Sequence, residues 1–237
     1  MGHRRRSAGF DRLAKGIPAQ VANGQMSGLR RLAARDIITD PQLLDLARRR
    51  GERLQDRRLA IWVLGYRAPA RSRRGLVELL ASERLRPLVM EAGTALSKRP
   101  LGNTTDVVCG VLQRAPEPWR RGAAAYALRR SRKPDSELHL MRAAGNSTES
   151  IGVRALAIET LGVLRSRRAI PTLRRLLNHK SAQLRLWSAY SLGQLRSRAA
   201  LPELEKLTLD RAKVRGLGTV ADEARDAIAR IMGASGG

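Results

Sequence analysis

A leucine recurs at nearly constant intervals along most of this 237-residue chain. The spacings are 32, 32, 32, 33 and 31 residues in the ladder Leu32, Leu64, Leu96, Leu128, Leu161 and Leu192. Twelve positions after each of them stands a second aliphatic residue: Leu44, Leu76, Val108, Leu140, Leu173 and Leu204. A period of this length is typical of a solenoid, in which each unit buries its apolar face by stacking on its neighbours. We therefore expect a chain of stacked repeats.

Each repeat is predicted to be a helical hairpin. The residues that lead up to a ladder leucine have apolar side chains at helical spacing, as in RRLAIWVLG (57–65), RGAAAYALR (121–129), RALAIETLG (154–162) and RLWSAYSLG (185–193). The partner helix is clearest in AIPTLRRLL (169–177) and ALPELEKL (200–207), where a proline stands in the first turn, which tolerates it. An insertion that contains Arg211, Lys213 and Arg215 displaces the last copy, which ends near Ile228.

Two longer stretches carry a family resemblance. They are VRALAIETLGVLRSRRAIPTLRRLL (153–177) and LRLWSAYSLGQLRSRAALPELEKL (184–207). Both resemble HEAT repeats of the short bacterial kind first associated with phycobilin lyases. The resemblance implies a right-handed stack of hairpins whose second helices line a concave face. It implies no particular activity, because the family includes lyase subunits, protein-binding scaffolds and nucleic-acid binders.

The predicted fold class is all-α, a right-handed α-solenoid of about six to seven HEAT-like helical hairpins over residues 21–232. We expect residues 1–20 to be a basic, partly disordered segment and residues 233–237 to be a flexible tail. The longest strongly apolar run, Leu59–Gly65, is far shorter than the ~20 residues of a membrane helix, and residues 1–10 lack the apolar region of a secretory signal. We therefore expect no membrane partner and a cytoplasmic location.

The charge balance points to a polyanionic partner. The chain has 46 Lys and Arg against 21 Asp and Glu, a formal net charge of +25 that is spread along its length. Almost all of these cations are arginines, whose planar guanidinium can donate two parallel hydrogen bonds to a phosphate or a carboxylate. Nucleic acid, DNA or RNA, is the predicted partner, and an acidic protein is the alternative.

Basic residues cluster just after the ladder leucines, where the helices should end. Neighbouring helices pack ~8 to 10 Å apart and phosphates on one strand advance ~3.4 Å per nucleotide, so each repeat of such an edge would span roughly three nucleotides. Cations at a helix C-terminus also gain about 0.3–1 kcal/mol from the helix dipole without any partner. The candidate edge residues are Arg67, Arg99, Arg132, Lys133, Arg165, Arg167, Arg196 and Arg198.

A second candidate surface follows the outward face of the second helices. The position two residues before the ladder leucine lies opposite the apolar arc, and most aromatic residues fall on it or beside it. Aromatic rings between arginines suit base stacking, although the same set could be a row of protein hot spots or could be buried against adjacent helices. The candidates are Trp62, Tyr66, Tyr126, Arg130, Trp187 and Tyr190, and Glu91 and Glu159 are predicted to share this face.

A further row of arginines stands seven residues before the ladder leucines. These residues, Arg57, Arg121, Arg154 and Arg185, lie beside the apolar arc, so we interpret them as structural. Each should pack its stem and bond a neighbouring turn.

No catalytic or metal-binding motif is apparent. His3, His139 and His179 are scattered, and Cys109 lies within an apolar run, so we predict no metal site, no cofactor and no catalytic residue. The leading hypothesis is a non-enzymatic nucleic-acid-binding HEAT-repeat protein. The second is a scaffold for an acidic protein or a ribonucleoprotein assembly. The third is an enzyme similar to HEAT-like DNA glycosylases, with Glu91 or Glu159 as the carboxylate.

Overall fold

This computed structural model describes residues 39–67, 70–131 and 133–233. These residues form twelve α-helices and one short hairpin of two strands, and the prediction of an all-α solenoid is confirmed. The chain divides into two compact units, Met1–Thr104 and Thr105–Gly237. The boundary between them falls inside the predicted solenoid of residues 21–232. The predicted basic segment 1–20, Leu32, Arg132 and most of the predicted tail lie outside the described residues.

The described part of the first unit contains two helical hairpins. Helix α3 (Asp40–Arg48) packs on α4 (Leu54–Arg67), and α5 (Ala70–Ser82) packs on α6 (Arg86–Leu96). The two second helices, α4 and α6, contact each other, as do the two first helices, α3 and α5. The ladder residues Leu64 and Leu96 are buried, as predicted. A short 3-10 helix, η1 (Gly102–Thr104), follows α6.

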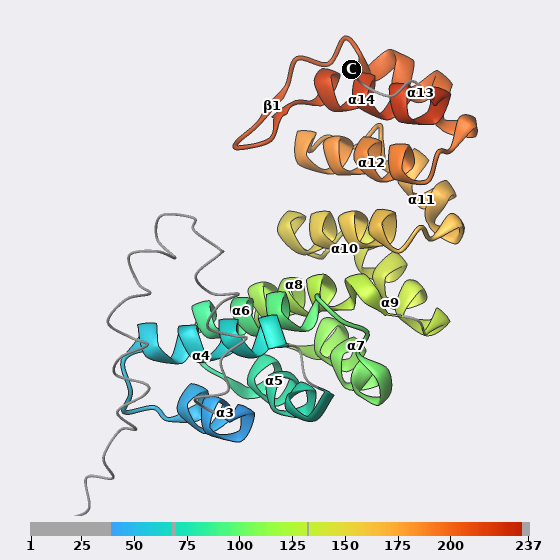
Figure 1. Cartoon of the computed structure of the whole chain (residues 1–237). Coiled ribbons are helices and arrows are strands. Elements are labelled where there is room, and N and C mark those ends of the chain that lie inside the picture. Colours follow the sequence, from blue (N-terminus) through green and yellow to red (C-terminus); the bar gives the residue numbers. More distant parts are fainter. Residues whose placement is uncertain (1–38, 68–69, 132, 234–237) are drawn as a thin grey trace, which may run out of the picture. The chain divides into compact units, whose positions relative to one another are not determined.

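Residues 105–131 and 133–233 of the second unit form four hairpins. Its first helices are α7 (Thr105–Arg114), α9 (Pro134–Gly145), α11 (Ile170–Leu176) and α13 (Leu201–Leu207). Its second helices are α8 (Pro118–Ala127), α10 (Ile151–Val163), α12 (Ala182–Gln194) and α14 (Val220–Met232). The second helices lie side by side in chain order, from green α8 to red α14 in Figure 1. Three 3-10 turns lie between successive hairpins: η2 (Leu128–Arg130), η3 (Arg167–Ala169) and η4 (Arg198–Ala200).

Small residues allow neighbouring second helices to approach closely. A glycine follows the ladder leucine in three repeats, and a Cβ built on it would lie within 2.9 Å of an atom of the next second helix. Between these helices Ser191 Oγ donates to the Ile158 carbonyl at 2.9 Å, and Thr160 Oγ1 donates to the Ala125 carbonyl at 3.1 Å. This close packing explains why the core is built from Leu, Ala and Val rather than from aromatic rings.

The insertion before the last second helix is a β-hairpin. Strand β1 (Lys213–Val214) pairs antiparallel with β2 (Gly218–Thr219), and Gly216 and Gly218 have positive φ values that other residues rarely adopt. The sequence indicates an insertion here but no hairpin. In Figure 1 the hairpin projects from the stack of second helices. None of the helices in the described ranges is long and apolar enough to cross a membrane.

Candidate functional site

Two kinds of turn alternate along the second unit, and their chemistry differs. Intra-repeat turns join the first helix of a hairpin to its second helix, for example between α9 and α10. Inter-repeat turns join a second helix to the first helix of the next hairpin, for example between α10 and α11. The two kinds of turn lie at opposite ends of the second helices, and both carry arginines.

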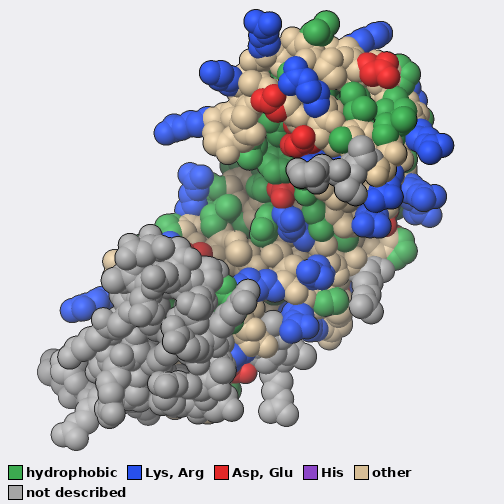
Figure 2. All heavy atoms as spheres, turned by 45° about the horizontal axis from the view of Figure 1, so that its top comes forward, with side chains coloured by type: hydrophobic (Ala, Val, Ile, Leu, Met, Phe, Trp, Pro, Cys, Tyr) green, Lys and Arg blue, Asp and Glu red, His purple; other side chains and the backbone are tan. Residues whose placement is uncertain are grey.

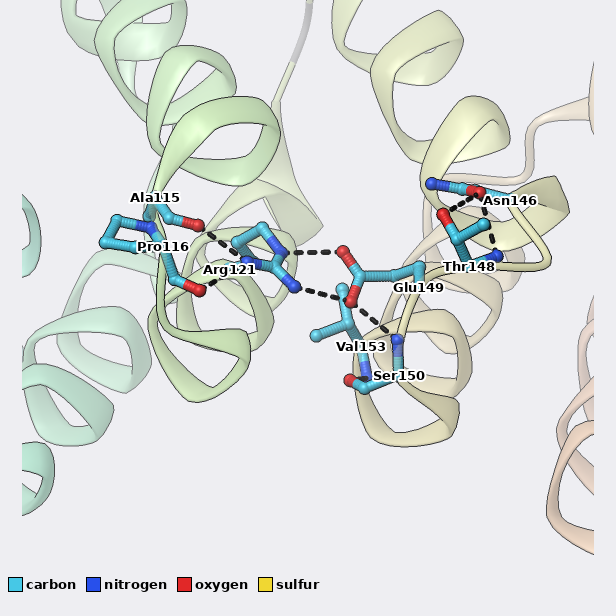
Figure 3. Close-up of polar contacts among 8 residues, drawn as sticks. All are labelled: Ala115, Pro116, Arg121, Asn146, Thr148, Glu149, Ser150 and Val153. Carbon is cyan, nitrogen blue, oxygen red and sulfur yellow. Dashed lines mark hydrogen bonds and ion pairs between the residues drawn. The ribbon is translucent and has the colours of Figure 1, made fainter.

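The intra-repeat turns are held by ion pairs, as Arg121 shows most clearly (Figure 3). Its guanidinium donates to the carbonyls of Ala115 at 2.6 Å and Pro116 at 2.9 Å. Both residues lie in the turn between α7 and α8. It also forms a two-pronged pair with Glu149 of the next repeat, with N–O distances of 2.6 and 2.8 Å. Burial raises the pKa of the Glu149 carboxyl, but the hydrogen bonds from Arg121 and from the Ser150 backbone outweigh this effect and lower it.

The same arrangement recurs at two other arginines of this row. Arg185 donates to the His179 carbonyl at 2.7 Å and to Asp210 Oδ2 at 2.7 Å. In the first unit Arg57 donates to the Ala47 carbonyl at 2.8 Å and pairs with Glu83. Arg154 donates to the Ala144 carbonyl at 3.0 Å, but its guanidinium faces His179 instead of a carboxylate. The prediction that this row is structural and bonds neighbouring turns is thus confirmed.

The inter-repeat turns carry the tripeptide Arg-Ser-Arg, and we call them the RSR turns. In two of them the central serine, Ser166 or Ser197, is buried while both arginines are exposed. The guanidinium groups of these four arginines make no hydrogen bond or ion pair with any other residue that the structure describes. The four are Arg165, Arg167, Arg196 and Arg198. A third RSR turn follows α8 with an exposed Arg130, but its Arg132 lies outside the described residues.

The first arginine of each of these two RSR turns has a backbone conformation that favours glycine. Arg165 has a φ of 55° and Arg196 a φ of 48°. Both end their helix with the same pair of hydrogen bonds: the Arg165 N–H donates to the Gly162 carbonyl and the following N–H to the Leu161 carbonyl. An L-residue other than Gly in this region loses roughly 1 kcal/mol or more. Local structure alone would therefore select glycine at these two positions.

Three other predicted edge residues lie in different surroundings. Arg67 is mostly buried and pairs with Asp40 at 3.1 Å, so its charge is compensated within the first unit. Lys133 pairs with Asp106 at 2.7 Å, although its side chain is 43% exposed. Arg99 is exposed. The most open set of predicted cations is therefore found in the RSR turns of the second unit.

The aromatic residues on the second helices are half-buried and lie against cations of their own unit. Arg129 stands over the Tyr126 ring at 4.6 Å from its centroid. Trp187 and Tyr190 meet edge to face with centroids 5.4 Å apart, and Arg230 lies 5.7 Å from the Tyr190 ring. The stripe predicted to face outward is thus only partly exposed, because arginines cover part of the Tyr126 and Tyr190 rings and Trp187 packs against Tyr190.

The first unit repeats this arrangement on its own second helices. Arg58 lies 5.2 Å from the centroid of the Trp62 ring, and Lys98 lies 3.6 Å from that of Tyr66. Both rings are half-buried. They are therefore partly occupied by intramolecular cations.

The two glutamates predicted to face outward are engaged by arginines. Glu91 is only 9% exposed, and Arg58 donates to its Oε1 at 2.5 Å, which corrects the prediction that Glu91 is exposed. Burial raises the pKa of Glu91, although Arg58 partly opposes this shift. Glu159 is half-buried and pairs with Arg129. The two carboxylates belong to different units, and neither is a free group beside an open aromatic face.

The residues typical of metal sites are dispersed. Over residues 39–67, 70–131 and 133–233 no group of three or more His, Cys, Asp and Glu side chains could hold a metal ion. Cys109 is buried in α7, and burial raises the pKa of its thiol to about 11. It packs as a small apolar residue.

Comparison with known proteins agrees with this architecture. The sequence profile of HEAT repeats matches residues 139–221. A solved complex of CpcE and CpcF of phycocyanin lyase from Nostoc sp. PCC7120 has a similar chain, with 22% identity, a TM-score of 0.57 and coverage of 81% of this chain and 76% of that chain. A search of curated proteins gave no match.

A second solved structure also has this fold. The YibA protein of Escherichia coli aligns with a TM-score of 0.52 and 18% identity over 94% of this chain and 81% of its own. At such identities these structures show a common fold and nothing more. The profile match locates HEAT repeats over residues 139–221, and the recurring hairpins and these structures agree with an α-solenoid fold.

Proposed function

We propose that this chain is a non-enzymatic nucleic-acid-binding HEAT-repeat protein that contacts phosphates through the RSR turns of its second unit. The observation that supports this function best is the row of exposed arginines at equivalent turns of successive repeats, without ion pairs to the described residues. Figure 2 shows Lys and Arg side chains protruding from the surface, with few Asp and Glu between them. Such a surface attracts polyanions strongly.

The contrast between the two kinds of turn supports a binding role for this edge. Arg57, Arg121 and Arg185 are neutralised by carboxylates of the same unit and stabilise the stack. The four arginines of the RSR turns at 165–167 and 196–198 pair with no carboxylate that the structure describes, and two of them adopt an unfavourable backbone conformation. Strained residues of this kind are concentrated at functional sites. Because these guanidinium groups bond no described residue, they are able to meet an external anion.

The spacing of the turns suits a nucleic-acid backbone. The second helices of the unit contact their neighbours in sequence, and packed helices lie ~8 to 10 Å apart. Arginines of successive turns would therefore meet phosphates roughly three nucleotides apart on one strand. Contacts of this type position a protein on a nucleic acid but do not read its sequence, so we expect little sequence preference.

The half-buried rings would take a secondary part in this binding. Tyr190 and Trp187 lie on α12, which ends at the RSR turn of Arg196, and Tyr126 lies on α8, which ends near Arg130. An unpaired base could meet an exposed edge of such a ring while its phosphate meets the turn. Because their faces are partly covered, these rings should contribute less than the guanidinium groups.

The test is fluorescence anisotropy of the full chain with labelled single-stranded and duplex DNA and RNA, titrated over a range of salt concentrations. Phosphate contacts release counterions, so affinity should fall linearly with salt on logarithmic axes, with a slope of about −0.9 per contact for duplex DNA. A tight complex with a steep slope supports the proposal and identifies the preferred nucleic acid. Weak binding to all four that disappears near physiological salt contradicts it.

A charge-reversal variant locates the contact. It replaces four arginines by Glu: Arg165, Arg167, Arg196 and Arg198. The affinity for nucleic acid should fall at least about 100-fold, and the slope of log affinity against log salt should become shallower by about 3 to 4. The matched control reverses four exposed cations on first helices of the same unit: Arg114, Arg142, Arg175 and Lys206. It changes the net charge equally, so an equal loss of affinity in both variants would show that only total charge matters.

The second candidate function is a scaffold for an acidic protein. The packed pair of Trp187 and Tyr190 beside Arg230 combines the residue types that dominate protein hot spots. The similar phycocyanin lyase structure is itself a complex of two proteins, CpcE and CpcF. If the chain is such a scaffold, replacement of Trp187 and Tyr190 by Ala should abolish binding of the protein partner and leave the affinity for nucleic acid nearly unchanged.

A further inference from the structure

An ion pair between successive repeats recurs at the intra-repeat turns, and it is missing at one of them. In three repeats the arginine near the start of the second helix pairs with a carboxylate of the following repeat, which is Glu83, Glu149 or Asp210. In the fourth, the residue that faces Arg154 from the following repeat is His179. No described carboxylate pairs with Arg154, although this residue is only 4% exposed. A buried guanidinium therefore lacks a negative partner at this turn.

The hydrogen bonding of His179 directs a second N–H donor toward the Arg154 guanidinium. The backbone N–H of Ser181 donates to His179 Nδ1 at 3.0 Å, so Nδ1 is an acceptor and the ring proton of a neutral imidazole resides on Nε2. Nε2 lies 3.4 Å from Nη1 of Arg154, which is also a donor. Two N–H groups thus face each other, and neither can accept from the other. An oxygen acceptor between or beside them would satisfy both.

The surrounding charges favour an anion at the same place. Burial lowers the pKa of His179, and the positive charges of Arg154, Lys180 and Arg185 lower it further. Arg185 is paired with Asp210, whereas Lys180 is exposed. In the neighbouring repeats the equivalent carboxylates are largely buried, with side chains 8% exposed for Glu149 and 18% exposed for Asp210. His179 is itself partly exposed and lies between the exposed residues Asn178 and Lys180, so a group that arrives from solvent can reach its ring.

We propose that Arg154 and His179 form a binding site for an external carboxylate, which takes the place that Glu149 and Asp210 fill in the adjacent repeats. The carboxylate accepts from Nη1 of Arg154 and from Nε2 of His179. Its source is an Asp or Glu side chain of a polypeptide or a small carboxylic acid. The site lies at the intra-repeat turns, away from the RSR turns, and does not depend on the proposed nucleic-acid binding.

NMR of the full chain labelled with ¹⁵N tests the donor geometry and the binding. The ring nitrogens of His179 should show a proton on Nε2 at neutral pH, and a proton on Nδ1 would overturn the proposal. Addition of acetate at constant ionic strength should shift the signals of His179 Nε2 and Arg154 Nε to saturation. Absence of a saturable shift, or a response to inorganic phosphate without a response to acetate, would also overturn it. Tighter binding of a short glutamate peptide than of acetate would identify a polypeptide as the source.

Two variants that add the same charge to the same loop complete the test. His179→Glu supplies the missing carboxylate, so it should raise Tm by about 2 to 4 °C and remove the acetate response. Asn178→Glu adds a carboxylate at an exposed neighbouring position and should leave the acetate response of Arg154 and His179 intact. Equal effects of the two variants on Tm and on the acetate response would show that loop charge alone is responsible and would refute the site.

Discussion

Gly162 and Ser191 lie in contact across adjacent second helices, so closely that a Cβ built on Gly162 would be 2.8 Å from the Cα of Ser191. Gly193 meets Ala227, and Gly65 meets Ala95, in the same way. Each of these glycines follows a ladder leucine. The repeats are therefore joined through backbone contact rather than through large interdigitating side chains.

Replacement of Gly162 by Ala should destabilise the second unit. The added methyl group has no space and forces α10 and α12 apart, which costs about 1–3 kcal/mol as in other overpacked cores. The control is Gly152→Ala in the same helix, where nothing lies within 4 Å of the added Cβ and helix propensity favours alanine. Urea denaturation should show a lower midpoint for the first variant and an equal or higher one for the second. Equal midpoints would contradict the contact.

Replacement of Arg165 or Arg196 by Gly should stabilise the protein and weaken nucleic-acid binding. Glycine relieves the positive φ angle at each turn, a gain of about 1 kcal/mol. Arg165→Lys keeps both the strained backbone and the charge, so it serves as the control with nearly unchanged stability. Thermal unfolding and anisotropy measured on the same preparations separate the two effects. A glycine variant that unfolds at a lower temperature would show that the arginine side chain stabilises the turn.

Loss of the Arg121–Glu149 pair should be costly. Glu149→Ala leaves a mostly buried guanidinium whose remaining hydrogen bonds to described residues go to the Ala115 and Pro116 carbonyls, and breaking buried pairs costs about 3–5 kcal/mol. Glu205→Ala, at an exposed position of α13, removes the same charge without removing an ion pair between described residues and should change stability by less than about 0.5 kcal/mol. Similar unfolding free energies for the two variants would contradict a structural role for the pair.

The same carboxylates should make the fold sensitive to acid. The pKa values of Glu83, Glu149 and Asp210 are lowered, because hydrogen bonds and nearby arginines outweigh the effect of burial. A lowered folded-state pKa contributes stability that is present above the unfolded-state pKa of about 4 and is lost as the pH falls through the folded value. Unfolding free energies measured from neutral to acidic pH should therefore decline below about pH 4. Glu149→Gln should flatten part of this decline.

Cys109 should resist thiol reagents in the folded protein. Its side chain is buried, and its raised pKa of about 11 leaves almost no thiolate at neutral pH. Labelling should therefore proceed through opening of α7 and should accelerate strongly in denaturant. Rapid labelling of the native protein, followed by absorbance of the released chromophore, would contradict the packing of this helix.

Much of the fold could be predicted because the repeat is a property of local sequence. The ladder leucines from Leu64 to Leu192 are buried as expected, and the helices lie where the apolar spacing places them. The arginines seven residues before these leucines were also assigned correctly, since their position beside the apolar arc fixes the direction of their stems. These features depend on residues within one or two turns of a helix.

The partners of charged groups could not be predicted in the same way. Arg121 and Glu149 are 28 residues apart. Glu149 lies just before a second helix, α10, whereas Glu83 lies directly after a first helix, α5. Such pairs have no fixed register in the sequence. The cations that cover Tyr126 and Tyr190 likewise come from a later turn or another helix. Exposure of the aromatic stripe was therefore overestimated, and the pairing of Arg67 with Asp40 had no sequence signal.

The ion pairs of the intra-repeat turns also determine how the stack can be edited. Each pair joins an arginine of one hairpin to a carboxylate of the next. The unit that contains both members of an ion pair therefore begins in one hairpin and ends in the following one. A hairpin that is deleted or exchanged as a unit removes the counter-charge of the hairpin before it. Modules cut from this protein for grafting should therefore run from one arginine to the following acid, overlapping two hairpins, rather than from helix start to helix end.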